Sequence, residues 1–224
     1  MGDLVGQLWL LRMVLWIVVG AVILLVVTGV GTRLLARRRA SRGAGRSDCR
    51  TSAAVEVDAL VARGPTAAPA ITAGLTSDDP RTRTIAAVAI GRARHRDQTP
   101  ALRALVDHEE DPVVLTAAVG ALGLVSGPGD VVVVLPLTAA GRPRSVRLAA
   151  VLALGALGGA AAVDGLADLL GDEDRWLAEL AAEVLGDVGP AGPAALEARV
   201  DDPGHVGEAA AYGLAMYRLR RDGP

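Results

Sequence analysis

The sequence predicts an all-α protein, in which an α-solenoid of about five helix pairs follows a single transmembrane helix. Three observations support this fold class. A motif of small and apolar residues recurs at intervals of about 31 residues. A long apolar stretch with one charge lies near the N-terminus. The composition lacks Phe and is rich in Ala, Leu and Val, which suits closely packed helices better than a sandwich or barrel.

The apolar stretch runs from Leu8 to Val30 and contains a single charge, Arg12. About 20 such residues span the hydrocarbon core of a bilayer. The stretch is long for the apolar region of a signal peptide, and no A-x-A cleavage site follows it. We therefore expect an uncleaved anchor within residues 1–32, with a buried soluble helix as the alternative.

An Arg-rich segment follows the apolar stretch and predicts the orientation of the stretch in the membrane. Seven Arg and one Asp lie between residues 33 and 50. By the positive-inside rule, the N-terminus faces outward and the longer C-terminal part faces the cytoplasm, as a single-pass protein of the cell membrane. Residues 33–52 are expected to form a flexible linker. Its membrane-flanking arginines are expected to meet anionic lipid headgroups: Arg33, Arg37, Arg38, Arg39 and Arg42.

The charge of the remaining chain is opposite in sign. From residue 51 onward there are 15 Arg and 23 Asp or Glu. A net acidic domain is poorly suited to a phosphate backbone, so a nucleic-acid partner is not expected. The single cysteine, Cys49, excludes a disulfide within the chain and fits a reducing compartment.

The repeat is clearest in a motif in which small residues precede an apolar residue and Gly. Its copies end at Gly91, Gly123, Gly155 and Gly186, and a degenerate last copy ends at Ala215. The apolar residue just before these positions recurs at intervals of 32, 32, 31 and 29 residues. A period in this range indicates stacked supersecondary units, and the repeat domain is expected over residues 53–224.

A second set of apolar residues falls between these copies, so each unit is expected to hold two short amphipathic helices. The set consists of pairs spaced i, i+4: Ile71/Leu75, Leu102/Val106, Val133/Leu137, Leu166/Leu170 and Leu196/Val200. Gly and Pro separate the helices. Asp79, Asp111 and Asp202 precede Pro and are expected to cap the following helix, as is Asp174 without a Pro.

Residues 131–137, VVVVLPL, fit this scheme poorly. Four consecutive Val favour a strand, and Pro136 falls inside the expected second helix. The register of the repeat favours a helix with Asp130 as its N-cap and a kink near Pro136. A local irregularity is the alternative.

The repeat resembles the short HEAT repeats of the phycobilisome-lyase type. Pro143 to Gly155 matches the family pattern closely, and Asp79 to Gly91 is a second match. The resemblance covers about residues 53–220. It implies a ladder between neighbouring units, in which Arg83 and Arg147 pair with acids that end the second helices. Leu115 and Ala178 replace the Arg in the other two units. The implied acids are Asp78 or Asp79, Asp107, Asp172, and Asp201 or Asp202.

No constellation of residues predicts a cofactor or a metal site. The three His lie at positions 95, 108 and 205 without ligand spacing. Deoxyhypusine hydroxylases, which are HEAT proteins, bind di-iron through several His-Glu pairs, whereas this chain has one, His108-Glu109. A basic patch could meet an acidic partner or lipid headgroups, with solvated surface as the alternative: Arg92, Arg94, His95, Arg96 and Arg103.

The sequence thus predicts a scaffold that binds a membrane-associated protein at the cytoplasmic face of the membrane. The alternative is an accessory or lyase-like enzyme subunit, although no catalytic residues are visible. Helical solenoids bind partners along the face of their second helices. The candidate interaction residues on that face are Arg103, Asp107, Asp168, Asp172, Glu197 and Arg199. After Pro203, a single helix to about Arg221 is expected to cap the stack.

Overall fold

The computed structural model describes residues 44–221, and every regular element in that range is an α-helix or a short 3-10 helix. None of these helices is long and apolar enough to cross a bilayer. The predicted anchor over residues 8–30 and the five membrane-flanking arginines lie outside the described residues.

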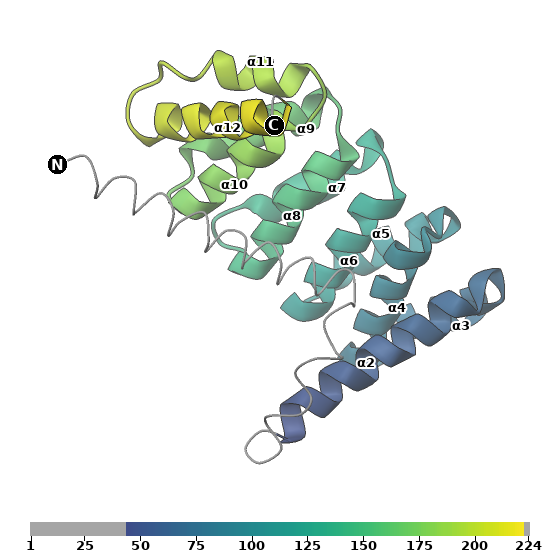
Figure 1. The fold of residues 1–224 in the computed structure, drawn as a ribbon. Coiled ribbons are helices and arrows are strands. Elements are labelled where there is room, and N and C mark those ends of the chain that lie inside the picture. Colours follow the sequence, from purple (N-terminus) through teal and green to yellow (C-terminus); the bar gives the residue numbers. More distant parts are fainter. Residues whose placement is uncertain (1–43, 222–224) are drawn as a thin grey trace. The chain divides into compact units, whose positions relative to one another are not determined.

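Residues 56–221 belong to one compact unit, in which first and second helices alternate between two layers (Figure 1). The first helices are α4 (Pro80–Ala93), α6 (Pro112–Val125), α8 (Arg144–Leu157), α10 (Arg175–Gly186) and α12 (His205–Arg221). The second helices are α3 (Ala68–Leu75), α5 (Thr99–His108), α7 (Val131–Val134), α9 (Ala160–Asp168) and α11 (Ala191–Glu197). Helix α2 (Ala44–Ala62) precedes α3, so five pairs precede the unpaired α12 in the described chain.

The recurring Gly allows successive first helices to pack closely. A Cβ added to Gly123 would lie 2.9 Å from Cα of Ala153 on the next first helix. Gly91 stands in the same relation to Ala121, at 3.1 Å. Because backbone atoms are the neighbours, a side chain could be accommodated only if the helices moved apart. The Gly of the motif therefore lies at the contact between neighbouring repeats.

The core follows the predicted apolar positions in both layers. Ile90, Leu122, Leu154 and Leu185 are fully buried on the first helices. Eight of the ten residues in the second-helix pairs are also buried, and the other two are not. Val133 is only half-buried, because Val134 takes its place in the core, and Val200 is exposed because α11 ends before it.

Three of the four N-caps predicted for first helices are confirmed, and that of Asp202 is wrong, because α12 begins at His205, three residues after it. The carboxylate of Asp79 accepts hydrogen bonds from the amides of Arg81 and Thr82, at 3.2 and 3.1 Å. Asp111 and Asp174 cap α6 and α10 in the same way. Pro143 stands at this position before α8 and provides no side-chain cap. Each carboxylate satisfies amides that the first turn of the helix leaves unpaired.

Residues 131–138 are helical, but the helix is short and changes type. Helix α7 ends at Val134, and a 3-10 turn covers Leu135–Thr138. The change falls at Pro136, which cannot donate an amide hydrogen bond to continue the α-helix. The expected N-cap is wrong: the side chain of Asp130 makes no cap hydrogen bond, because it binds Arg103 instead.

Of the first and last helices in the described range, α12 agrees with the prediction and α2 does not. Helix α12 begins at His205 and ends at Arg221, as the capping helix was expected to do. Helix α2 begins at Ala44, so residues 44–52 are helical where a flexible linker was expected. No Pro interrupts residues 44–62, and this stretch is rich in Ala and Val, so the helix can extend N-terminally from the repeat.

Candidate interaction surface

Three of the six candidate residues project from different second helices into solvent. Asp107 lies on α5, Asp168 on α9 and Glu197 on α11, and all three are exposed. Asp168 lies 4.0 Å from Arg199, which also contacts Asp202 at 3.3 Å. The structure therefore brings Asp168 and Arg199 together, across two successive repeats.

Arg103 is exposed but bound. Its Nε and Nη2 atoms donate to the two carboxylate oxygens of Asp130, with Nη2 to Oδ2 at 2.9 Å. The Asp130 side chain is only 4% exposed, against 46% for Arg103. The hydrogen bond to this carboxylate raises the pKa of Arg103, so the guanidinium is charged at any working pH. Arg103 thus presents a fixed positive charge at the surface.

Asp172 does not belong to the exposed surface. Its side chain is 14% exposed and pairs with Arg147, which is itself buried. Arg147 Nε also donates to the carbonyl of Thr138 at 2.7 Å. The Arg147–Asp172 pair is the ladder contact that the family resemblance implied, and its role is to join two repeats.

The corresponding contact of Arg83 differs from the prediction. Arg83 binds Glu109, at 2.7 and 3.0 Å, rather than Asp107. Its Nη1 atom donates to the carbonyl of Ser77 at 2.8 Å. The hydrogen bonds from Arg83 to the Glu109 carboxylate are the main cause that lowers the pKa of Glu109. Each ladder arginine therefore binds the turn before its own helix and an acid about 25 residues later.

A local signal in the sequence identifies these acids. Glu109 and Asp172 both stand two residues before a capping Asp, and each accepts a hydrogen bond from that residue's amide, at 3.0 and 2.9 Å. Asp107 lies two residues before Glu109 and is exposed on α5. The spacing acid-x-Asp before a first helix would have selected Glu109 from the sequence.

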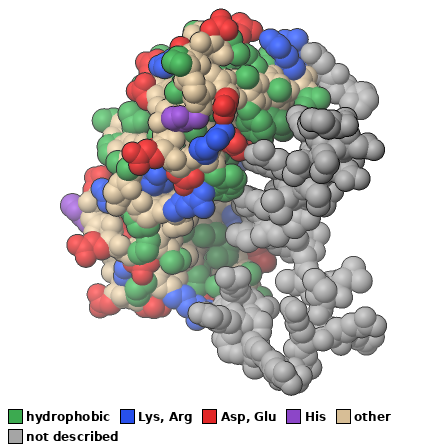
Figure 2. Space-filling model, turned by 90° about the vertical axis from the view of Figure 1, so that its left-hand side faces the viewer, with side chains coloured by type: hydrophobic (Ala, Val, Ile, Leu, Met, Phe, Trp, Pro, Cys, Tyr) green, Lys and Arg blue, Asp and Glu red, His purple; other side chains and the backbone are tan. Residues whose placement is uncertain are grey.

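Acidic partners neutralise only part of the predicted basic patch. Arg92 pairs with Asp58 at 2.7 Å. Arg94 donates to the carbonyl of Leu124 at 2.7 Å and ends α4 in the left-handed conformation, with a φ of 56°. Arg96 remains exposed, and no ion pair joins it to any described residue. On the face shown in Figure 2, acidic and basic side chains are interspersed with apolar ones.

An open groove of about 430 Å³ lies beside this patch, between the start of α5, the end of α6 and the turn before α7. Its volume falls within the range of small-ligand sites. The lining residues are Arg96, Thr99, Pro100, Arg103, Val125, Ser126, Gly127 and Asp130.

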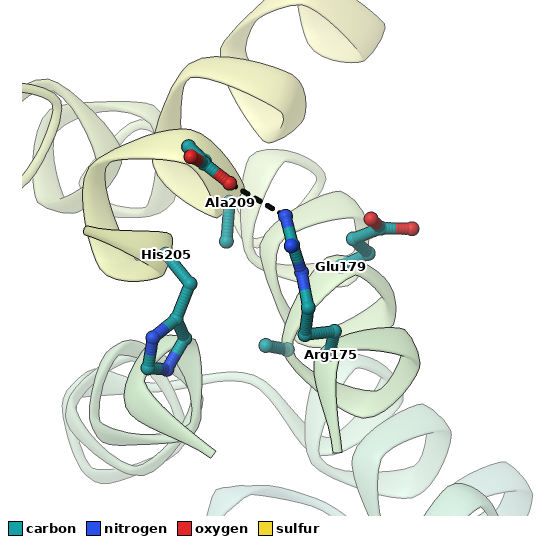
Figure 3. Close-up of a pocket in the computed structure, with 6 residues that line it drawn as sticks. Arg175, Glu179, His205 and Ala209 are labelled. Carbon is teal, nitrogen blue, oxygen red and sulfur yellow. Dashed lines mark hydrogen bonds and ion pairs between the residues drawn. The ribbon is translucent and has the colours of Figure 1, made fainter. Parts of the chain in front are cut away.

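A smaller hollow lies between α10 and α12 (Figure 3). Arg175 reaches across it to the carboxylate of Glu208, and the His205 ring lies beside them (Figure 3). The Nε2 atom of His205 is buried without a hydrogen-bond partner among the described residues. The space measures about 30 Å³, which holds a water molecule but no substrate.

The two side chains of the His108-Glu109 pair have different surroundings. Glu109 is bound to Arg83 through both carboxylate oxygens, and His108 is exposed at the end of α5. Within residues 44–221, no group of three or more His, Cys, Asp or Glu side chains lies close enough to hold a metal ion.

Comparisons with known proteins agree with the repeat architecture. The sequence pattern of HEAT repeats matches residues 36–123, 68–144 and 131–215. No curated protein sequence matches the chain. A solved structure of human deoxyhypusine hydroxylase in complex with glycerol is 22% identical, with 74% of this chain and 80% of that chain covered and a TM-score of 0.28. The three matches to HEAT repeats span most of the chain, which therefore belongs to the HEAT repeat family.

Proposed function

We propose that this chain is a membrane-tethered helical-repeat scaffold that binds a membrane-associated protein through the exposed face of its second helices. The observation that carries the proposal is that some charged residues join the repeats, whereas others on the second helices form no ion pair within the described chain. The ladder pairs of Arg83 and Arg147 hold the repeats together at the turns. Asp107 and Glu197, by contrast, form no ion pair with a described residue.

Charged side chains that form no ion pair with a described residue, or only an exposed one, are available to a partner. Asp107 and Glu197 are of the first kind, and Asp168, whose side chain is 83% exposed and lies 4.0 Å from Arg199, is of the second. These three residues lie on α5, α9 and α11, in three different repeats, so a partner that contacts all three must lie along the stack. Solenoids bind extended partners in this way. Surface electrostatics of this kind contribute chiefly to specificity and association rate.

The membrane part of the proposal rests on the sequence of residues 8–30 and on the arginines that follow it. A tether confines the repeat domain to a thin layer beside the bilayer, which raises its effective concentration toward membrane partners. The Arg-rich segment would strengthen this by binding anionic headgroups, at about 1 kcal/mol per Arg near the surface.

Cross-linking in native membranes at endogenous expression tests the proposal. The full chain is expected to capture a protein partner, and the charge reversal Asp107→Lys, Asp168→Lys and Glu197→Lys should abolish the capture. The matched control reverses three exposed acids at the inter-repeat turns: Asp78→Lys, Glu110→Lys and Asp201→Lys. It carries the same change in net charge and should retain the partner.

Four outcomes would contradict the proposal or one of its parts. Failure to capture any protein, or equal loss in both triple variants, removes the case for a second-helix binding face. A stoichiometric chromophore or metal in the purified chain would instead favour an enzyme accessory. Recovery of the chain in the alkaline-soluble fraction of cells would contradict the anchor alone.

A further inference from the structure

The groove beside α5 contains a cationic site that the fold positions but does not use fully. Asp130 holds Arg103 through Nε and Nη2, and no described residue bonds Nη1. Arg96 lines the same groove and is exposed. Because Asp130 is buried and binds two of the three guanidinium nitrogens, it fixes the position of Arg103 before any ligand arrives.

The start of α5 adds to this cationic character. Helix α5 has 10 residues and no side-chain N-cap, and its first two residues, Thr99 and Pro100, line the groove. The amide of Thr99 donates to the carbonyl of Arg96 and Pro100 has no amide hydrogen, so this end of the helix contributes its dipole rather than a set of free amides. An anionic group bound there would meet two guanidinium groups and this helix end.

The other lining groups distinguish between classes of anion. The hydroxyl of Ser126 donates to the carbonyl of Leu122, and that of Thr99 donates to Arg96, both at 2.8 Å. Each hydroxyl proton is therefore already used, and the oxygen can only accept a further hydrogen bond. Asp130 contributes a carboxylate to the same wall and neutralises Arg103. The described residues of the groove thus carry one uncompensated guanidinium, on Arg96, which matches the single charge of a carboxylate better than the double charge of a phosphate.

Apolar surface completes the match to a peptide. Pro100 and Val125 line the groove between the charged and hydroxyl groups. A short extended segment combines a carboxylate, amide donors and apolar side chains in a length that about 430 Å³ accommodates.

We propose that this groove binds an acidic segment of a partner protein, with an Asp or Glu carboxylate held by Arg96 and by Nη1 of Arg103. The inference rests on the proposed scaffold function and names the chemistry of its partner. It also adds a second contact region, at the turn of the second complete repeat, to the face of the second helices.

Retention of hexapeptide pools by the purified full chain tests this directly. In each pool one position is fixed as Glu, Lys, Leu or phosphoserine, and the others are degenerate. We expect the Glu pool to be retained at least fivefold more than the Lys pool. Arg96→Glu should abolish this preference and Arg96→Lys should restore most of it, whereas Arg142→Glu, at an exposed inter-repeat turn, should leave it unchanged.

Each alternative has its own outcome. Strongest retention of the phosphoserine pool, or displacement of the Glu pool by millimolar inorganic phosphate, would overturn the proposal in favour of a phosphate site. Displacement by soluble dihexanoyl phosphatidylglycerol alone would do so in favour of lipid headgroups. Absence of any Glu preference while the native membrane partner is still captured would reject the groove and leave the scaffold function standing.

Discussion

Arg147 shows how one side chain can join three parts of the chain. Its guanidinium binds the carbonyl of Thr138 before its own helix and the carboxylate of Asp172 before the next first helix. Only 6% of Arg147 is exposed, so both partners would lose a charged donor in a poorly solvated place if it were removed. The exposed pair of Arg175 and Glu208 joins α10 and α12 without this burial.

We expect Arg147→Met to lower the free energy of unfolding by about 3 kcal/mol, since it removes the donor to the Thr138 carbonyl and leaves the Asp172 carboxylate with only the amide of Asp174. Methionine keeps much of the apolar stem, so the loss reports on the charge. The matched control, Arg175→Met, should cost at most about 1 kcal/mol. Urea unfolding followed by circular dichroism measures both, and equal losses would refute a special role for Arg147.

Glu109 should contribute to acid sensitivity. Hydrogen bonds from Arg83, and then from backbone amides, hold its pKa below the ordinary value of 4.5. Its ionised form therefore stabilises the fold fully above the unfolded pKa, and this contribution is lost as the pH falls through the folded pKa. We expect Glu109→Gln to be less stable at pH 7 and to lose less stability below about pH 4.5. A parallel pH profile of unfolding midpoints would contradict this.

At the scale of elements, packing between first helices depends on which face of a helix carries Gly. Gly123 and Gly120 lie in the same helix, α6. A Cβ at Gly123 would press on the backbone of Ala153, whereas a Cβ at Gly120 would meet no atom within 4 Å. Sequence spacing alone does not distinguish the two, because both occur in one run of small residues.

The two glycines provide a matched pair of substitutions. Gly123→Ala should destabilise the chain by about 1–3 kcal/mol, because helices α6 and α8 must separate. Gly120→Ala should stabilise it by about 0.4–1 kcal/mol, since it only lowers the entropy of the unfolded chain. Thermal unfolding of the two variants tests the sign, and a loss of stability with Gly120→Ala would show that the helix contact is not the cause.

At the scale of the whole molecule, the stack of described repeats ends at α12. The last copy of the motif has Ala215 where earlier copies have Gly, and Ala215 is exposed. On the side toward α10, Gly213 approaches the carbonyl of Ala182, where an added Cβ would lie at 2.6 Å. The last helix therefore keeps a close contact with the preceding repeat and lacks the residue that the other copies use toward a following one.

Deleting residues 204–224 should expose the face of α10 that α12 covers, including the buried residues Ala178, Ala182 and Gly186. We expect a lower melting temperature and aggregation, seen by calorimetry and by light scattering after size exclusion. Deletion of residues 222–224 alone serves as the control and should change neither. An unchanged melting curve of the longer deletion would refute a capping role.

The sequence by itself determined the features that act within a few residues or that recur with the period. These include the helix pairs, the caps at Asp79, Asp111 and Asp174, and the final helix. Only the tertiary structure decided which side chains meet across repeats. Arg83 binds Glu109 rather than Asp107, and Asp130 binds Arg103 rather than capping α7. Caps depend on neighbouring residues, whereas these partners lie 26 and 27 residues apart and meet only through the packing of adjacent helix pairs.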